Sequence, residues 1–193
     1  MIGAAFGVVL ARAQAGDEAA FARLFADVQP ALLRYLRVIT PEAEDVAGDT
    51  WLQVVTGLRG FRGEEEAFRA WLFTIARHRA ADAGRSRARR PAGPLAVSEA
   101  AQGLAAQGLA AGQPLAPDAA DLALDGISAR AVVALIATLP RDQAEVVMLR
   151  VVAGLEVADV ARIVGKSPGA VRVAAHRALR RLAAQLERAG VTP

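Results

Sequence analysis

Two stretches of the sequence concentrate arginine, the side chain best suited to bind phosphate and guanine. The first, residues 77–90, has six arginines and one acid, Asp82. The second, residues 162–188, has six arginines and Lys166 against one acid, Glu187. A single basic run is typical of a solvated helix face. Two such runs, each closing a separate apolar stretch in a chain of net charge +3, indicate a nucleic-acid partner.

The remaining titratable residues offer little chemistry for catalysis. The chain has no cysteine and two histidines, His78 and His176, and it shows neither a phosphate-cradling glycine loop nor a paired-carboxylate arrangement. The lack of cysteine excludes a disulfide framework, a thiolate zinc finger and a cysteine nucleophile. We therefore expect a protein that is not an enzyme and has no catalytic residues, no cofactor and no metal site.

The elements that carry the arginines are predicted to be helices. Of the 193 residues, 54% are apolar, which is enough for one sizeable core or two small ones. Alanine and leucine dominate, and β-branched and aromatic residues are too sparse for a large sheet. The apolar start, residues 1–10, lacks a basic beginning and is far shorter than a membrane span. We predict an all-α, cytoplasmic protein with no membrane partner.

A low-complexity segment divides the chain. Residues 91–128 are rich in Pro, Gly, Ala and Gln, contain four acids and no base, and repeat the pentapeptide Ala-Ala-Gln-Gly-Leu. Glycine and proline at this frequency interrupt long helices, so we expect a flexible linker. The predicted division is an N-terminal extension at 1–15, an N-terminal module at 16–90, the linker at 91–128, a C-terminal module at 129–188 and a tail at 189–193.

The N-terminal module is predicted to contain several helices with apolar inner faces. One helix carries Phe21, Leu24, Phe25 and Val28 at helical spacing, and Pro30 is predicted to begin another. Thr40 and Pro41 suit the cap and first position of a third helix. Its polar stripe at i, i+4 and i+8 is formed by Asp45, Asp49 and Gln53, opposite buried Val46 and Val54. A last helix spans residues 68–79, and we expect its Trp71 and Phe73 to lie in the core.

The C-terminal module contains the pattern of a helix-turn-helix. Residues 156–164 have helical apolar spacing and Gly165 ends them, after which Ser167 caps a second helix that begins at Pro168. The predicted inner stripe of that helix is Val171, Ala174, Ala175, Ala178 and Leu182. Its predicted outer face is Arg172, His176, Arg177, Arg180 and Arg181. Two helices joined in this way also form ordinary hairpins, but a basic outer face directly after the cap favours a helix that enters a DNA groove.

Three stretches in this order resemble the extracytoplasmic-function (ECF) group of the sigma-70 RNA polymerase sigma factors. They are Ala43-Glu-Asp-Val-Ala-Gly-Asp-Thr-Trp-Leu, Phe68-Arg-Ala-Trp-Leu-Phe-Thr-Ile-Ala-Arg, and Leu139-Pro-Arg-Asp-Gln-Ala-Glu-Val-Val-Met-Leu-Arg with the helix-turn-helix after it. The resemblance implies that the N-terminal module is sigma region 2, which binds core RNA polymerase and reads the single-stranded −10 element. The C-terminal module is then sigma region 4, which reads the −35 element as duplex.

The resemblance also implies partners and roles for particular residues. The stripe of Asp45, Asp49 and Gln53 is expected to contact the β′ clamp of core polymerase, and the C-terminal module is expected to dock near the β flap. A flipped base needs a pocket and a cationic strand path, which we assign to the loop with Phe61 and Arg62 and to Arg69, Arg77, His78, Arg79 and Arg85. An anti-sigma protein is a further expected partner, besides promoter DNA.

On the recognition helix, Arg172, Val173 and His176 are the expected readers of base edges. Phosphate contacts are expected from Arg177, Arg180 and Lys166, and the capping Ser167 is also expected to bind the −35 DNA. The chain departs from the family at two positions, with Gly48 where a glutamine is usual and His78 where asparagine is frequent. The alternative is a stand-alone helix-turn-helix regulator, which would explain the C-terminal module and leave the first basic run and the clamp-like helix without a role.

Overall fold

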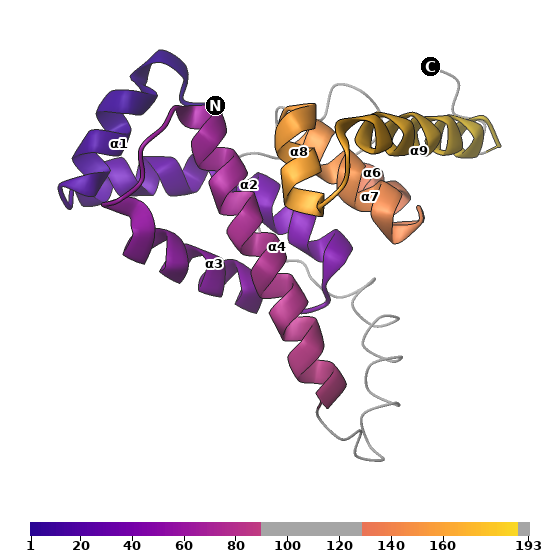
Figure 1. Cartoon of the computed structure of the whole chain (residues 1–193), viewed down its shortest axis with the longest axis horizontal. Coiled ribbons are helices and arrows are strands. Elements are labelled where there is room, and N and C mark those ends of the chain that lie inside the picture. Colours follow the sequence, from indigo (N-terminus) through magenta and orange to yellow (C-terminus); the bar gives the residue numbers. More distant parts are fainter. Residues whose placement is uncertain (90–128, 189–193) are drawn as a thin grey trace.

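The computed structural model describes residues 1–89 and 129–188, and the regular elements within them are all helices (Figure 1). The all-α prediction is confirmed. The predicted linker at 91–128 and the tail at 189–193 lie outside the described residues, as does Arg90. The elements of the first part are η1 (Gly3–Ala5), α1 (Phe6–Gln14), α2 (Glu18–Ile39), α3 (Ala43–Leu58) and α4 (Glu65–Arg89). Those of the second part are α6 (Ala129–Ala137), α7 (Arg141–Val147), the π-helical turn η3 (Met148–Val152), α8 (Val157–Val164) and α9 (Pro168–Arg188).

Helix α2 is the central element of the N-terminal module. The Asp17 carboxylate caps it by accepting a hydrogen bond of 3.0 Å from the Ala20 N–H. We predicted a break at Pro30, but the helix continues through it. Proline removes one backbone hydrogen bond, whereas the apolar face runs without interruption from Leu24 to Leu36, both of which are buried. Burial of this face outweighs the lost bond.

Residues 1–15 are not an extension in the structure. Helix α1 packs along α2 and buries Phe6, Val9, Leu10 and Ala13. The Phe6 ring meets the Phe68 ring of α4, with 5.7 Å between centroids. The Gln14 amide then donates to the carbonyl oxygens of Leu58 and Phe61, at 2.8 and 2.9 Å. The N-terminal helical bundle therefore includes α1.

Helix α3 begins later than we predicted. Thr40 is the last residue of the α2 segment, where its N–H donates to Leu36, and its hydroxyl accepts from the Glu42 N–H at 3.3 Å. The helix starts at Ala43, and Pro41 lies before it. The reason is that Thr40 is buried in extended backbone at the end of α2, so its hydroxyl serves the turn. Val46 and Val54 are buried as predicted.

The two modules pack against one another. Helices α2 and α4 contact α7, η3 and α8, and Figure 1 shows the C-terminal helices lying beside α2 and α4. The C-terminal module buries Met148, Leu149, Leu155, Val160 and Val171, which belong to the same hydrophobic cluster as the buried residues of the N-terminal module. Along the described ranges, no helix combines the length and the apolar character that a membrane crossing requires.

Candidate nucleic-acid interface

The predicted helix-turn-helix is confirmed in its local geometry. Helix α8 ends at Gly165, whose φ of +68° and ψ of +36° lie in the left-handed region that glycine adopts without strain. The following Lys166 N–H donates back to the Ala161 carbonyl at 3.0 Å, which tightens the turn. The Ser167 hydroxyl then accepts from the Ala170 N–H at 3.2 Å and caps α9. Local residues thus fix the start of the second helix.

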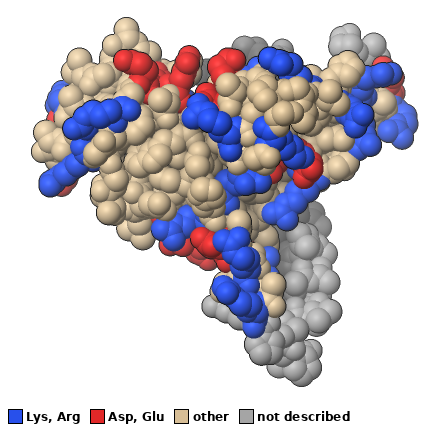
Figure 2. All heavy atoms as spheres, in the orientation of Figure 1, with Lys and Arg blue, Asp and Glu red and all other residues tan. Residues whose placement is uncertain are grey.

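The outer face of α9 is exposed and strongly basic. Val171 and Ala178 anchor its inner face in the core. The exposed residues include all the predicted base readers and phosphate contacts of this helix, namely Arg172, Val173, His176, Arg177 and Arg180. Figure 2 shows basic side chains gathered toward the far end of α9. This face therefore has the donors and the access that a duplex groove requires.

Lys166 has an internal partner. Its ammonium pairs with the Asp142 carboxylate on α7, and this hydrogen bond lowers the pKa of the Asp142 carboxyl below its usual value. The two side chains are 34% and 70% exposed, so the pair is one that water and salt weaken. Lys166 can exchange this partner for a DNA phosphate at little cost.

The C-terminal half of α4 forms a second basic surface, which Figure 2 shows at the lower end of the molecule. His78 and Arg85 are exposed there, and Arg79 donates from Nε to the Gln53 amide oxygen at 3.0 Å. Arg85 pairs with Asp82 on the same helix, and Arg87 pairs with Glu42 at 2.7 Å. These exposed pairs are weak, so a nucleic-acid strand can replace them.

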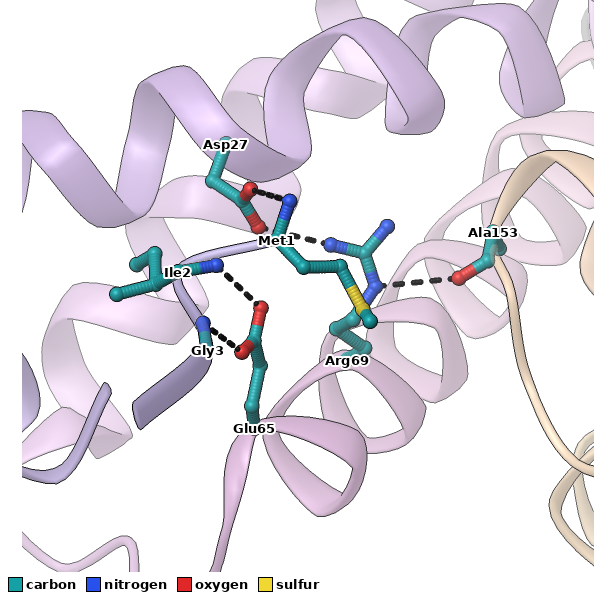
Figure 3. A network of polar contacts seen from close by, with 7 residues as sticks. All are labelled: Met1, Ile2, Gly3, Asp27, Glu65, Arg69 and Ala153. Atoms are coloured by element: carbon teal, nitrogen blue, oxygen red, sulfur yellow. Dashed lines mark hydrogen bonds and ion pairs between the residues drawn. The ribbon is translucent and has the colours of Figure 1, made fainter. Parts of the chain in front are cut away.

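Arg69 and Arg77 do not join this surface. We placed both on the −10 path, but Arg69 is buried, with its guanidinium bound to the Asp27 carboxylate at 2.9 Å and to the Ala153 carbonyl at 3.1 Å (Figure 3). Arg77 is half-buried and donates from Nε to Glu145 at 2.8 Å. Both are used in the contact between the modules, because Ala153 and Glu145 belong to the C-terminal module.

Aromatic side chains fill the loop between α3 and α4, where we predicted a pocket for a flipped base. The Phe61 ring stacks on Trp71, with 5.1 Å between centroids, and meets Phe68 edge-on at 5.6 Å. Arg62 is exposed and donates to the backbone carbonyls of Arg59 and Phe61. Phe73 is fully buried, as predicted, whereas Trp71 is only half-buried. Phe61 is thus a packing residue in this arrangement, and Arg62 remains available.

The predicted clamp-binding stripe is exposed on α3, and two apolar residues that we did not predict extend it. Asp45 and Asp49 face solvent, and Leu52 and Val55 on the same helix are 69% and 54% exposed. Beside Val55, a pocket of about 290 Å³ lies between α1, α2 and α3. The signal was present in the sequence, because Leu52 follows Asp49 by three residues and therefore shares its face. An exposed mixture of carboxylates and apolar side chains is typical of a protein-binding surface.

The part of the chain that the structure describes contains no cluster of three or more histidine, aspartate or glutamate side chains placed to hold a metal ion.

Comparison with known proteins matches both modules to one family. Residues 24–90 match the family model described as sigma-70 region 2, and residues 129–182 match that of sigma-70, region 4. The ECF RNA polymerase sigma factor SigD of Mycobacterium tuberculosis is 36% identical over 98% of this chain and 88% of its own length. ShbA of Streptomyces griseus, also an ECF RNA polymerase sigma factor, is 34% identical over 94% of this chain and 95% of its own.

Solved structures agree with this fold. CnrH, solved in complex with the cytosolic domain of CnrY, aligns with a TM-score of 0.58 and 26% identity over 95% of this chain and 98% of its own. The sigma factor RpoE of Bartonella quintana, solved with the anti-sigma factor NepR, aligns with a TM-score of 0.60 and 24% identity over 86% of this chain and 96% of its own. The fold and its basic surfaces define a two-module DNA-binding protein of the transcription machinery. The chain belongs to the ECF RNA polymerase sigma factors of the sigma-70 family.

Proposed function

We propose that this chain binds core RNA polymerase and directs it to promoters, with the C-terminal module on the −35 duplex and the N-terminal module on the −10 single strand. The observation that carries the proposal is that one chain holds both family modules in order, each with a basic surface. A stand-alone regulator would not need the region 2 module or its exposed α3 face. The role is that of an initiation factor without catalysis of its own, working in the cytoplasm beside polymerase and DNA.

Core polymerase is proposed to bind first at α3. Its Asp45 and Asp49 supply negative charge for the basic coiled coil expected in the β′ clamp, and Leu52 and Val55 supply apolar area. Gln53 stands at the edge of this surface and is already bound by Arg79. A charged rim around a small apolar centre is the arrangement that gives a specific but reversible protein contact. The C-terminal module is proposed to dock near the β flap.

The −35 element is proposed to be read by the N-terminal half of α9. Arg172 and His176 can donate hydrogen bonds to base edges, and the exposed valine between them, Val173, can contact a thymine methyl group. Arg177, Arg180 and Lys166 are assigned to phosphates, where they position the helix without specifying sequence.

The −10 strand is proposed to follow α4. The accessible residues of this path are Arg62, His78, Arg79 and Arg85. Arg69 and Arg77 become available to the strand only when the modules separate. Phe61 is kept as a candidate for stacking on a flipped base through the part of its ring that Trp71 and Phe68 leave uncovered.

Regulation by an anti-sigma protein is also proposed. It is supported by the two structural relatives described above, of which RpoE was solved with an anti-sigma factor and CnrH with CnrY. Such a partner would act by covering the surfaces on α3 and α9.

The test is run-off transcription with purified core polymerase and a pool of genomic fragments, with and without this chain. Discrete transcripts that require both components support the proposal, and their start sites locate the promoters. If the chain binds duplex DNA alone and adds no transcript with core polymerase, the regulator is the correct function.

A further inference from the structure

Ser86 lies on the basic surface of α4, close to the end of that helix. It is exposed, and it comes seven residues after Arg79 and eight after His78. Side chains at this spacing are stacked about two turns apart on one face of a helix, so Ser86 shares the face that carries these two residues. The surface that we assign to the −10 strand therefore includes a hydroxyl group.

Among the described residues, Ser86 has the one serine or threonine hydroxyl that makes no hydrogen bond within the protein. The hydroxyls of Thr50, Thr56 and Thr74 each donate to the carbonyl oxygen four residues back, at 2.7, 2.8 and 2.7 Å. The others serve turns or caps, namely those of Thr40, Thr138 and Ser167. The Ser86 oxygen is therefore open to a reagent that approaches from solvent.

Positive charge surrounds this hydroxyl. Arg85 and Arg87 are its neighbours in the sequence, and Arg89 follows one turn later on the same face. Arg85 pairs with Asp82, but these side chains are 62% and 57% exposed, so the pair is weak. Arg89 is exposed and has no carboxylate partner in the described part of the chain. A phosphate attached to Ser86 has guanidinium groups within reach, and the segment has the charge that an enzyme with an acidic groove selects.

The end of α4 gives an enzyme access to the hydroxyl. The helix ends at Arg89, and the last turn of a helix opens at little cost because its carbonyl groups lack helical partners. A kinase binds the segment around its target serine in extended form. The last turn can become extended without disturbing the core, because residues 84–89 are all exposed.

We propose that Ser86 is a phosphorylation site for a serine kinase with an acidic substrate groove, and that the phosphate closes the −10 path on α4. The modification stands on the exposed hydroxyl and its arginines, while the block on the strand rests on the proposed function. In the transfer, the Ser86 oxygen forms a bond to the γ-phosphorus of ATP and the bond from that phosphorus to the bridging oxygen breaks. ADP leaves, and the hydroxyl proton passes to a carboxylate of the kinase.

The phosphate acts on the strand through its charge. Phosphoserine carries a charge of about −1.5 to −2 at neutral pH, which offsets about two arginine contacts with strand phosphates. The logarithm of single-strand affinity changes with the logarithm of salt concentration by about −0.7 for each such contact. Loss of about two contacts therefore flattens this slope by about 1.4 and lowers the affinity at about 0.1 M salt by about 25-fold.

Transfer of labelled phosphate tests the site. The purified full chain is incubated with ATP labelled in its γ-phosphate and with an extract of the cells that make the chain, and mass spectrometry locates the phosphate. We expect label on Ser86, its loss in Ser86→Ala, and several-fold slower transfer when Arg87→Gln and Arg89→Gln remove the flanking charge. Absence of label, or label that Ser86→Ala does not reduce, overturns the modification. Equal transfer to the arginine variant overturns the acidic groove.

Binding of single-stranded DNA tests the block. The full chain with phosphoserine installed at position 86 during translation is titrated with a labelled oligothymidine of about 12 nucleotides, over about 0.05–0.2 M salt. The matched control carries phosphoserine in place of Ala19, which is exposed at the start of α2. Arg87 pairs with Glu42 at 2.7 Å, so the end of α4 lies near the other end of α2, about 30 Å from Ala19. We expect the 25-fold loss, an estimate of about that size, and the flatter slope only with phosphoserine at position 86.

The outcomes separate the block from the two claims beside it. Equal affinity of the unmodified and phosphorylated chains, or an equal loss in the Ala19 control, overturns the block, while the transfer of label decides the modification. Run-off transcription by the unmodified chain with core polymerase reports independently whether the proposed function itself stands.

Discussion

Leu52 provides the sharpest test of the α3 surface. Its side chain is 69% exposed in the chain, so truncation to alanine removes area that only a partner would bury. Burying a whole leucine side chain contributes about 1.5–3 kcal/mol. The exposed part that Leu52→Ala removes then corresponds to about 1–1.5 kcal/mol, or roughly a 5- to 12-fold weaker affinity for core polymerase.

The assay is a fluorescence-anisotropy titration of labelled chain with core polymerase, together with urea unfolding of each variant. Unfolding stability is expected to change by less than about 0.5 kcal/mol, since the side chain makes few contacts to lose. The matched control is Val8→Ala on α1, which truncates a side chain that is 66% exposed on a different helix. If Leu52→Ala and Val8→Ala bind core polymerase as tightly as wild type, α3 is not the clamp surface.

Three further predictions concern the DNA surface and the fold. Arg172→Ala is expected to lose about 1–3 kcal/mol of the binding free energy that separates the correct base pair from the others at one −35 position. Arg180→Ala is expected to weaken the affinity for all sequences alike, because it contacts phosphate. Titrations with promoter variants measure both effects. Gly48→Ala is expected to stabilise α3 by about 1 kcal/mol, because an added Cβ meets nothing within 4 Å. Gly165→Ala is expected to destabilise the folded chain by about 1–2 kcal/mol, because the φ of Gly165 is +68°. Urea midpoints equal to that of the wild type would contradict both predictions. Burial, and then Glu145, raise the pKa of the Tyr35 hydroxyl well above its usual value. The folded chain therefore keeps this proton where the unfolded chain loses it, so stability falls as pH rises above about 10. Tyr35→Phe should flatten that dependence in urea melts at pH 9 to 11.

The features that the sequence could predict are those fixed by neighbouring residues. The helix-turn-helix depends on Gly165, Ser167 and Pro168, whose conformational preferences act within a few residues, and each stands where it was predicted. The exposed stripe of α3 likewise follows from a helical repeat. The family resemblance added the order of the two modules, which no local pattern contains.

The features that were missed depend on residues far apart in the chain. Arg69 resembled a strand-binding arginine, but its burial depends on Asp27 and Ala153, which are 42 and 84 positions away. The sequence predicted an extension where α1 lies, because the packing of its apolar residues depends on the contact between Phe6 and Phe68. Pro30 predicted a helix break, but the helix continues because its apolar face is buried in the surrounding bundle. Tertiary packing, which a single sequence does not display, decided all three.

We propose that the chain opens promoters together with core polymerase. The most direct measurement places 2-aminopurine in the −10 region of a promoter duplex identified by run-off transcription and follows its fluorescence, which rises when the base leaves the stack. We predict a rise only when the chain and core polymerase are both present, and a loss of that rise when the −35 element is changed. A rise with core polymerase alone, or tight duplex binding by the chain without any rise in the presence of core polymerase, would show that the chain does not open promoters in this way.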